Sequence, residues 1–379
     1  MGTSIQHLSD KVRLVASPSA WIEGKAIEQL KKTAQLDGVV SAVGLPDLHP
    51  GRGYPIGAAF LTEQTIYPAL VGNDIGCGMA FWQTDIKCNK VHLDKFGKKL
   101  QSSGEPLDDS WRDYISERKH ELGLTTSAFD HSLGTVGGGN HFAELQRLHE
   151  IYDASALEQH GVNEKSLQLL VHSGSRGLGQ SILRSHVDRY GHAGLNARSD
   201  AGRDYLAQHD QALRYAELNR ELIALRICKA LSTSGENICQ VDHNLVQQHG
   251  PNGWLHRKGA TPADRGIVMI PGSRGDLSYL VEPVNAEPSL WTLAHGAGRK
   301  WVRSECKGRL DKRFSVDVLS RSRFGSRLIC DDKALIYEEA PPAYKAIDRV
   351  IDDMLSAGLI RVLASFRPVI TLKLQGRGC

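Results

Sequence analysis

Short apolar runs that end at polar, glycine-rich runs recur along this chain. Residues 39–43 and 58–61 flank the polar run 47–53, and residues 169–171 and 267–270 are two further apolar runs. Short runs of Val, Ile and Leu bounded by glycine or proline predict buried strands. Because binding and catalytic residues concentrate on loops at the ends of rigid elements, we expect these strands to deliver polar residues to a site.

Helical periodicity is clearest over residues 204–231. Apolar side chains there recur at i, i+3, i+7 and i+10 from Tyr215 to Leu225, which predicts one buried helical face. A second helix is predicted over residues 342–357. One side of it would carry Ile347, Ile351 and Leu355.

The polar runs are scattered from Asp47 to Lys373, so one site would draw on almost the whole chain. Strands and helices are interspersed, and no low-complexity linker or fixed repeat divides the sequence. We therefore expect an α+β fold with central β-sheets flanked by helices, glycine-rich site loops, and a single catalytic domain over residues 1–379.

Composition narrows the class of protein. The chain has 379 residues, of which 41% are hydrophobic and 23% charged, as in an ordinary globular protein with a large core. The 38 glycines show no period, which indicates many tight turns rather than a fibre. The seven cysteines have no regular spacing and do not predict a disulfide framework. With no apolar leader or membrane-length apolar stretch, we expect a cytoplasmic protein.

The net charge of +3 is too weak by itself to indicate nucleic-acid binding. The charge is unevenly distributed, however, because residues 299–327 contain ten Lys or Arg residues against three acidic ones. Such a cluster is either a solvated basic face or a surface for a polyanion, and composition leaves both interpretations open.

Five residues on glycine-rich or polar runs are candidate metal ligands. Asp74 and Cys77 lie in Gly-Asn-Asp-Ile-Gly-Cys-Gly, His141 follows three glycines and an asparagine, His172 opens His-Ser-Gly-Ser-Arg-Gly, and His243 lies in Asp-His-Asn. Carboxylate, thiolate and imidazole together suit Mn²⁺, Zn²⁺ or Fe²⁺, and a thiolate with imidazole makes zinc the default. The alternative is that these are structural groups, since most of the 16 histidines must be.

His295 precedes the run Gly296-Ala297-Gly298-Arg299, which has almost no side chains before its arginine. Backbone N–H groups in such a turn form an anion-binding nest. The histidine beside it could be a general acid, a nucleophile that attacks a phosphate, or another metal ligand. A nucleophilic imidazole needs a carboxylate to orient its other ring nitrogen, and Asp47 is the candidate.

In this order the motifs resemble the RtcB family of RNA ligases, over nearly the full length from Leu45 to Lys373. The matching motifs are Asp-Ile-Gly-Cys-Gly, Gly-Gly-Gly-Asn-His-Phe, His-Ser-Gly-Ser-Arg-Gly, Arg-Lys-Gly-Ala-Thr, Pro-Gly-Ser and His-Gly-Ala-Gly-Arg. The resemblance implies a protein that joins RNA ends with GTP and manganese.

The resemblance also implies a division of the metal ligands. Cys77 would bridge two Mn²⁺ ions, His141 and His172 would complete one site, and Asp74 and His243 would complete the other. His295 would attack the α-phosphate of GTP to form a covalent His–GMP adduct.

Further roles follow from the same resemblance. Asp47 would orient His295. Guanosine- and nucleotide-binding positions would be Asn140, Phe142, Glu144, Ser273, Ser278, Gly296, Ala297, Gly298, Tyr344 and Lys373. Phosphates of nucleotide or RNA would be bound by Arg176, Arg299 and Arg303, with Asn140 beside them.

The implied reaction joins an RNA 3′-phosphate or 2′,3′-cyclic phosphate to a 5′-hydroxyl through a 3′-guanylylated RNA. The alternative is a dinuclear metal-dependent phosphoesterase that acts on RNA ends without nucleotide transfer. Two positions depart from the family pattern: Arg274 replaces an apolar residue, and Leu374 follows Lys373 where glycine is usual. These traits resemble a divergent subgroup associated with a release-factor-H-like partner, which implies repair of damaged RNA, with tRNA or ribosomal RNA left open.

Overall fold

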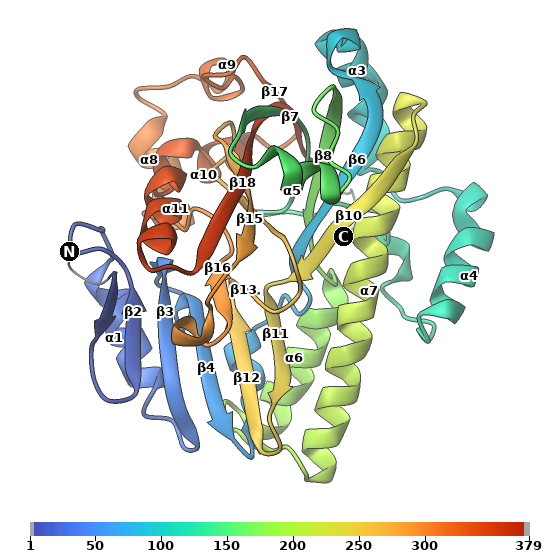
Figure 1. The fold of residues 1–379 in the computed structure, drawn as a ribbon. Coiled ribbons are helices and arrows are strands. Elements are labelled where there is room, and N and C mark those ends of the chain that lie inside the picture. The colour runs from blue at the N-terminus through green and yellow to red at the C-terminus, as the bar shows by residue number, and fades with distance from the viewer. Residues whose placement is uncertain (1–3, 375–379) are drawn as a thin grey trace.

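The computed structural model describes residues 4–374 and arranges most of their strands in two sheets (Figure 1). The first sheet has six strands in the order β1-β2-β3-β4-β12-β11. Their bounds are β1 Ile5–His7, β2 Val12–Val15, β3 Val39–His49, β4 Ile56–Glu63, β12 Gly253–Lys258 and β11 Asn244–His249. Only the pair β2–β3 is parallel among the paired strands described for this sheet.

The second sheet has eight strands in the order β10-β6-β8-β7-β18-β15-β14, with β17 paired in parallel to β18. Their bounds are β10 Gly235–Asp242, β6 Gly78–Lys87, β8 Ser166–Ser173, β7 Phe142–Ile151, β18 Ile360–Lys373, β15 Ser278–Pro283, β14 Val268–Pro271 and β17 Arg327–Cys330. Two short pairs complete the strands: β13 Ala260–Pro262 with β16 Thr292–Ala294, and β5 Thr65–Ile66 with β9 Leu195–Asn196.

Helices flank both sheets. Their bounds are α1 Gly24–Thr33, α2 Pro68–Val71, α3 Leu93–Leu100, α4 Arg112–Glu121, α5 Ala154–Gln159, α6 Gly177–Tyr190, α7 Asp200–Leu231, α8 Arg303–Leu310, α9 Val316–Leu319, α10 Lys333–Glu338 and α11 Ile347–Ser356. The long α7 runs down the right-hand side of Figure 1, and α8 to α10 gather at the upper left. No helix in the described part of the chain is long and apolar enough to span a membrane.

The helix α7 is stabilised by an N-terminal cap and by apolar side chains on its buried face. The Ser199 hydroxyl caps the first turn by accepting from the Gly202 amide. Ile223, Ala224 and Ile227 pack into the core that β6, β8 and β18 share. The predicted helix over 204–231 is confirmed, with a start four residues earlier.

The α+β class is confirmed, as are the strands predicted at 39–43, 58–61, 169–171 and 267–270. The strand expected over 39–43 is longer than predicted, because β3 continues to His49 and includes the start of the polar run 47–53. Burial of Leu45 and Leu48 keeps that stretch extended, and a shift in register between Gly44 and His49 accommodates it. That residues 1–379 form one domain stays a prediction.

The second predicted helix was placed too early. Residues 341–343 form a 3₁₀ turn, Tyr344 is extended, and α11 begins at Ile347. The proline pair 341–342 lacks the N–H donors that a continuous helix would need. Leu355 is 42% exposed, and Met354 is buried in its place. The six cysteines described are free, as the irregular spacing predicted.

Candidate active site and metal centre

One cavity of about 660 Å³ collects the candidate residues from both sheets. It is lined by every predicted metal ligand, by His295, and by every predicted nucleotide- and phosphate-binding residue. Asp47 is fully buried behind His295 rather than on the cavity wall. Residues more than 300 positions apart in the sequence therefore share one site.

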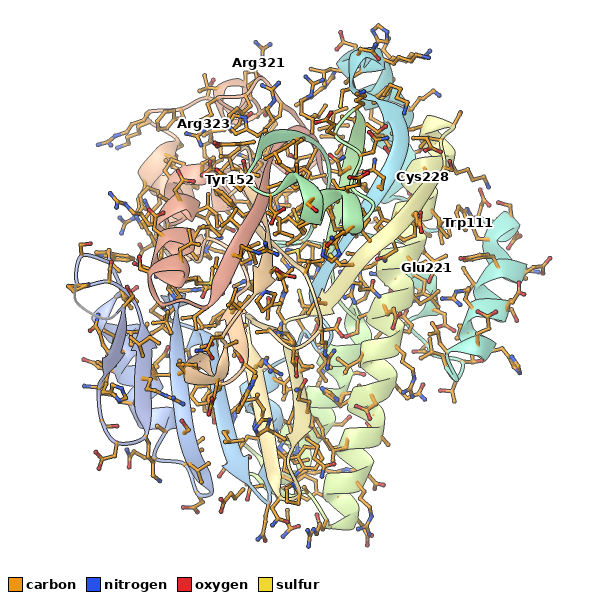
Figure 2. All side chains as sticks on the ribbon, in the orientation of Figure 1. Trp111, Tyr152, Glu221, Cys228, Arg321 and Arg323 are labelled. Carbon is orange, nitrogen blue, oxygen red and sulfur yellow. The ribbon has the colours of Figure 1, made fainter. Side chains whose placement is uncertain are left out.

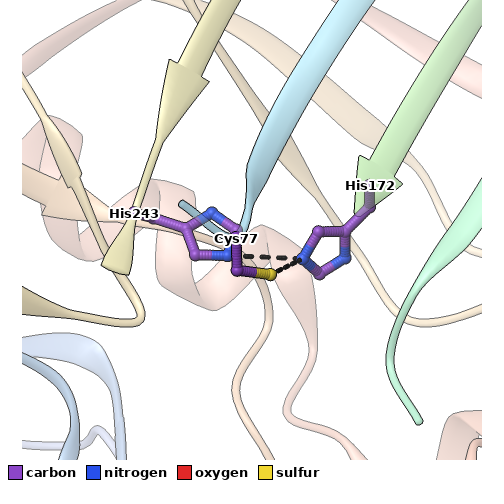
Figure 3. Close-up of side chains that lie close together, drawn as sticks. All are labelled: Cys77, His172 and His243. Carbon is purple, nitrogen blue, oxygen red and sulfur yellow. Dashed lines mark hydrogen bonds between the residues drawn. The ribbon is translucent and has the colours of Figure 1, made fainter. Parts of the chain in front are cut away.

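Cys77 lies at the centre of the candidate metal group (Figure 3). Its Sγ is 3.2 Å from His172 Nε2 and 3.3 Å from His141 Nε2. His172 Nε2 is in turn 3.3 Å from His243 Nε2. The ligand atoms of Cys77, His172 and His243 all lie within 4.8 Å of one another. A single ion could therefore contact all three without a large movement.

A second group shares the same thiol. Asp74, Cys77 and His141 also place one ligand atom each within 4.8 Å, and His141 Nε2 is 2.8 Å from Asp74 Oδ2. The five predicted ligands thus come together, with Cys77 common to both groups. The side chains group differently from the expected division: His243 lies with His172, and Asp74 lies with His141. Which residues share an ion stays a prediction.

Backbone geometry holds the cluster together. Asp74 and Cys77 lie on the turn between α2 and β6, and the His243 amide donates to the Cys77 carbonyl at 2.7 Å. The fully buried Arg220 donates to the Gly76 carbonyl at 2.6 Å and pairs with Asp242 at 2.7 Å. Gly174 must lack a side chain, since a Cβ there would lie 2.3 Å from Asp74 Oδ1.

The protonation states fit a cation. Burial lowers the pKa of His172 and of His243 well below the usual histidine range, so both imidazoles are neutral, the form in which they could bind a metal ion. Burial and then the charge of Asp74 raise the pKa of the Cys77 thiol, a penalty that a bound cation reverses. For Asp74, burial is outweighed by His141 and by hydrogen bonds, which bring its pKa to about 2. The donor set of sulfur, nitrogen and carboxylate oxygen suits Mn²⁺, Fe²⁺ or Zn²⁺.

His295 and Asp47 form a buried pair at the edge of this cluster. Asp47 Oδ2 is 2.6 Å from His295 Nδ1 and also accepts from the His295 amide at 3.3 Å. With Nδ1 donating to the carboxylate, the lone pair of the imidazole is on Nε2. The His295 ring centroid is 4.9 Å from that of His243, so this nitrogen belongs to the metal end of the cavity.

The backbone around Asp47 is fixed from two sides. The Lys345 ammonium donates to the carbonyls of Pro46 and Leu48 at 2.9 and 2.8 Å. Gly298 approaches so closely that a Cβ there would lie 2.3 Å from the Asp47 carbonyl oxygen, and its φ of 69° also favours glycine. These contacts explain why a glycine is needed three residues after His295.

The predicted guanosine-binding residues line one wall. Gln146 joins two of them by donating to Glu144 at 2.8 Å and to the Ser278 hydroxyl at 2.9 Å. Thr371 donates a hydrogen bond to the same Glu144 carboxyl. Burial raises the pKa of Glu144 to about 7, although the hydrogen bonds and Lys373 oppose the shift.

Glu339 organises the neighbouring wall and was not predicted. Its buried carboxylate accepts from Arg299 at 3.0 Å, from Arg303 at 3.3 Å and from the Tyr344 hydroxyl. Burial would raise its pKa, but Lys373 and the two arginines lower it to about 2. Glu339 follows Glu338 at the end of α10, and two adjacent acidic residues do not indicate a role in organising a cavity wall. The arginine and lysine partners of Glu339 are distant in the chain.

Arg299, Lys373 and Arg274 have contacts that bear on their predicted roles. Arg299 donates to Trp301, Glu338, Glu339, Tyr344 and Cys306. Lys373 donates to the carbonyls of Gly139 and His141, both at 2.9 Å. Arg274 Nη2 donates to the carbonyls of Leu319 and Ile336. All three therefore support the cavity wall in this structure, and the contacts of Arg299 and Lys373 with phosphate or nucleotide stay predictions.

Much of the basic segment 299–327 is exposed. Arg321 and Arg323 lie at the upper left of the molecule, on the opposite side from Trp111 and Glu221 (Figure 2). Arg323 is paired with Asp276 at 2.6 Å, which removes part of the positive charge. Within the cavity Arg176 is hydrogen-bonded to Thr135 at 3.3 Å and stays available for an anion.

Comparison with known proteins identifies the relatives of this chain. A family model described as tRNA-splicing ligase RtcB matches residues 29–122 and 116–374. The chain is 52% identical to a protein of Escherichia coli named RNA-splicing ligase RtcB2, over 99% of both chains. It is 29% identical to the tRNA-splicing ligase RtcB of Archaeoglobus fulgidus, over 92% of this chain and 91% of that one. It is 30% identical to the RNA-splicing ligase RtcB of Mycobacterium tuberculosis, over 91% and 100% respectively.

Proposed function

The chain belongs to the RtcB family, and on that premise we propose that it is an RNA ligase that uses GTP and two Mn²⁺ ions. It joins an RNA 3′-phosphate, or a 2′,3′-cyclic phosphate after hydrolysis, to a 5′-hydroxyl. One observation carries the proposal: His295, paired with the buried Asp47, lines the same cavity as the thiol–imidazole cluster. A nucleophile and a cation site are thereby within reach of one triphosphate.

In the first step, the lone pair of His295 Nε2 attacks the α-phosphorus of GTP. The bond from that phosphorus to the bridging oxygen breaks, and its electron pair leaves with pyrophosphate. Asp47 keeps the Nδ1–H in place and offsets the positive charge that develops on the ring. When bound, Mn²⁺ at Cys77 and its neighbours supplies positive charge that stabilises the phosphate oxygens.

In the next steps, an oxygen of the RNA 3′-phosphate attacks the same phosphorus, and the electron pair of the broken N–P bond returns to His295. The 5′-hydroxyl oxygen then attacks the RNA phosphorus, GMP leaves, and the hydroxyl proton passes to solvent. His295 Nε2 is thereby regenerated with its lone pair.

The cavity wall contains a group that would favour guanine over adenine as the bound base. Once deprotonated, the Glu144 carboxylate is an acceptor for N1–H and for the 2-amino group of guanine, which adenine cannot match in the same way. Arg176 and Arg303 add positive charge for phosphates. We further propose that residues 1–379 act as one domain, and that the protein repairs broken RNA, with a release-factor-H-like protein as partner.

The test is covalent labelling with α-³²P-labelled GTP and Mn²⁺. The wild type should give an acid-labile labelled protein, and His295→Ala should not. His131→Ala is a matched control, because His131 is exposed and hydrogen-bonded within its own turn. Equal labelling of wild type and His295→Ala would refute nucleotide transfer through this residue.

An end-joining assay with defined RNA ends separates the two enzyme classes. The ligase should join a 3′-phosphate strand to a 5′-hydroxyl strand in a GTP-dependent reaction. Opening of a cyclic phosphate without GTP, together with no joining when GTP is present, would favour a metal-dependent phosphoesterase instead.

A further inference from the structure

A second hollow of about 490 Å³ adjoins the mouth of the catalytic cavity. It is lined by two tryptophans and by residues of both charges. Four of its residues also line the catalytic cavity: Glu23, Lys300, Trp301 and Val302. A strand that leaves the catalytic cavity in this direction would therefore meet the hollow directly.

The apolar groups of the hollow are unusually exposed. Trp21 is 54% exposed and Val302 is 63% exposed. A tryptophan left open to water beside a catalytic cavity contributes little to the core, so packing does not explain it.

Cations lie against both indoles. Arg309 is 5.1 Å from the ring centroid of Trp301, and the Lys345 ammonium is 6.0 Å from that of Trp21. Arg309 also pairs with Glu305 at 2.7 Å, so part of its charge is already balanced.

Exposed aromatic rings with Lys300 and Arg309 beside them match the chemistry of a single-stranded nucleic acid, although Glu23 and Glu305 also line the hollow. The bases of such a strand stack on aromatic rings, while its phosphates are attracted by nearby Lys and Arg. An apolar peptide would use the tryptophans but would gain nothing from Lys300 and Arg309. We propose that Trp21 and Trp301 form a stacking subsite for a base of the RNA next to its broken end. This inference rests on the proposed function.

The first experiment compares Trp21→Ala with Trp111→Ala. Trp111 is the matched control, since it lies across the molecule from α8 and carries a comparable cation, Lys229, 4.9 Å from its ring. At limiting RNA, joining by Trp21→Ala should fall about tenfold, the usual scale for one stacked base. Labelling of the protein by GTP should stay unchanged in both variants.

The second experiment removes the base instead of the tryptophan. RNA strands whose two terminal nucleotides at the break lack bases should be joined about tenfold more slowly by wild type at limiting concentration. Trp21→Ala should join the abasic and intact strands at nearly the same rate, because the contact is already lost.

The outcomes separate the two proposals. If wild type neither labels with GTP nor joins RNA, the proposed ligase function fails. If wild type joins RNA but Trp21→Ala joins it equally well, the stacking subsite is refuted and the ligase function stands. Weaker GTP labelling by Trp21→Ala, or an abasic defect that adds in full to that of Trp21→Ala, would also overturn the subsite.

Discussion

Asp47→Asn tests whether the carboxylate orients the proposed nucleophile. Asp47 Oδ2 accepts both from His295 Nδ1 at 2.6 Å and from the His295 amide at 3.3 Å. An amide nitrogen in that position would face two donors. The substituted amide must therefore turn its oxygen toward His295, or the imidazole must carry its proton on Nε2, where it blocks attack.

The structure sets the size of the expected loss in guanylylation rate. Asp47 is fully buried and its Oδ1 has no hydrogen-bond partner among the described residues, so a turned amide would bury an unpaired NH₂ there. That costs about 1–3 kcal/mol, and replacing a charged acceptor by a neutral one costs about 1–2 kcal/mol more. The sum of about 2–5 kcal/mol predicts guanylylation about 30-fold to 5,000-fold slower, at 1.36 kcal/mol per tenfold.

The assay is single-turnover labelling with α-³²P GTP, with metal content measured on the same preparation. Since Asp47 is not a candidate metal ligand, the variant should bind metal like the wild type. Labelling within about threefold of the wild-type rate, at equal metal content, would contradict the proposed orienting role.

Three further sets of substitutions test the candidate metal centre, the protonation of Glu144 and the Arg220–Asp242 ion pair behind the metal cluster. Cys77→Ala should lose both bound metal ions, because Cys77 belongs to both ligand groups. Asp74→Ala should lose one. If elemental analysis finds two ions per chain in Cys77→Ala, Cys77 does not bridge them. Burial raises the pKa of Glu144 from 4.5 to about 7, so its native carboxyl holds a proton that the unfolded chain releases. Stability should therefore fall by about 3 kcal/mol as pH rises from about 4.5 to about 7. Glu144→Gln should remove that slope in urea unfolding curves, and an unchanged slope would refute the assignment. Arg220→Met should lower the free energy of unfolding by about 3–5 kcal/mol, because it leaves a buried carboxylate unpaired. Arg118→Met breaks a more exposed pair and should cost about 0–1 kcal/mol, and equal losses in the two variants would contradict this account.

Local pattern predicted the elements well where burial and periodicity agree. The face of α7 that contains Tyr215 and Leu222 could be read from spacing because its residues are buried together, against the segment that includes Trp111 and Leu133. The end of β3 could not, because the glycine-rich stretch after Asp47 resembles a loop. Pairing with β4 and burial of Leu48 extend the strand, and both depend on residues outside the local window.

The candidate metal ligands show a similar limit. Their residue types and glycine-rich surroundings were sufficient to select five side chains that the structure brings together. The division into two groups could not be obtained, because it depends on how β8 and the turn after β10 approach the Cys77 turn in space. Asp74 and His141 are 67 positions apart, yet their side chains are 2.8 Å from each other.

Arg299 makes contacts within the cavity wall that compete with its predicted contact to a phosphate. Its guanidinium donates to five protein partners, among them the buried carboxylate of Glu339 and the hydroxyl of Tyr344. If Arg299 broke those contacts to reach a phosphate, the nearly fully buried charge of Glu339 would lose one of its cationic partners. Leaving a buried charge with fewer partners is energetically costly. Arg303 is different, because its side chain is 46% exposed and makes a single longer contact with the same carboxylate. The cheaper rearrangement is therefore for Arg303 to turn toward an incoming phosphate while Arg299 holds Glu339 and Tyr344 in place.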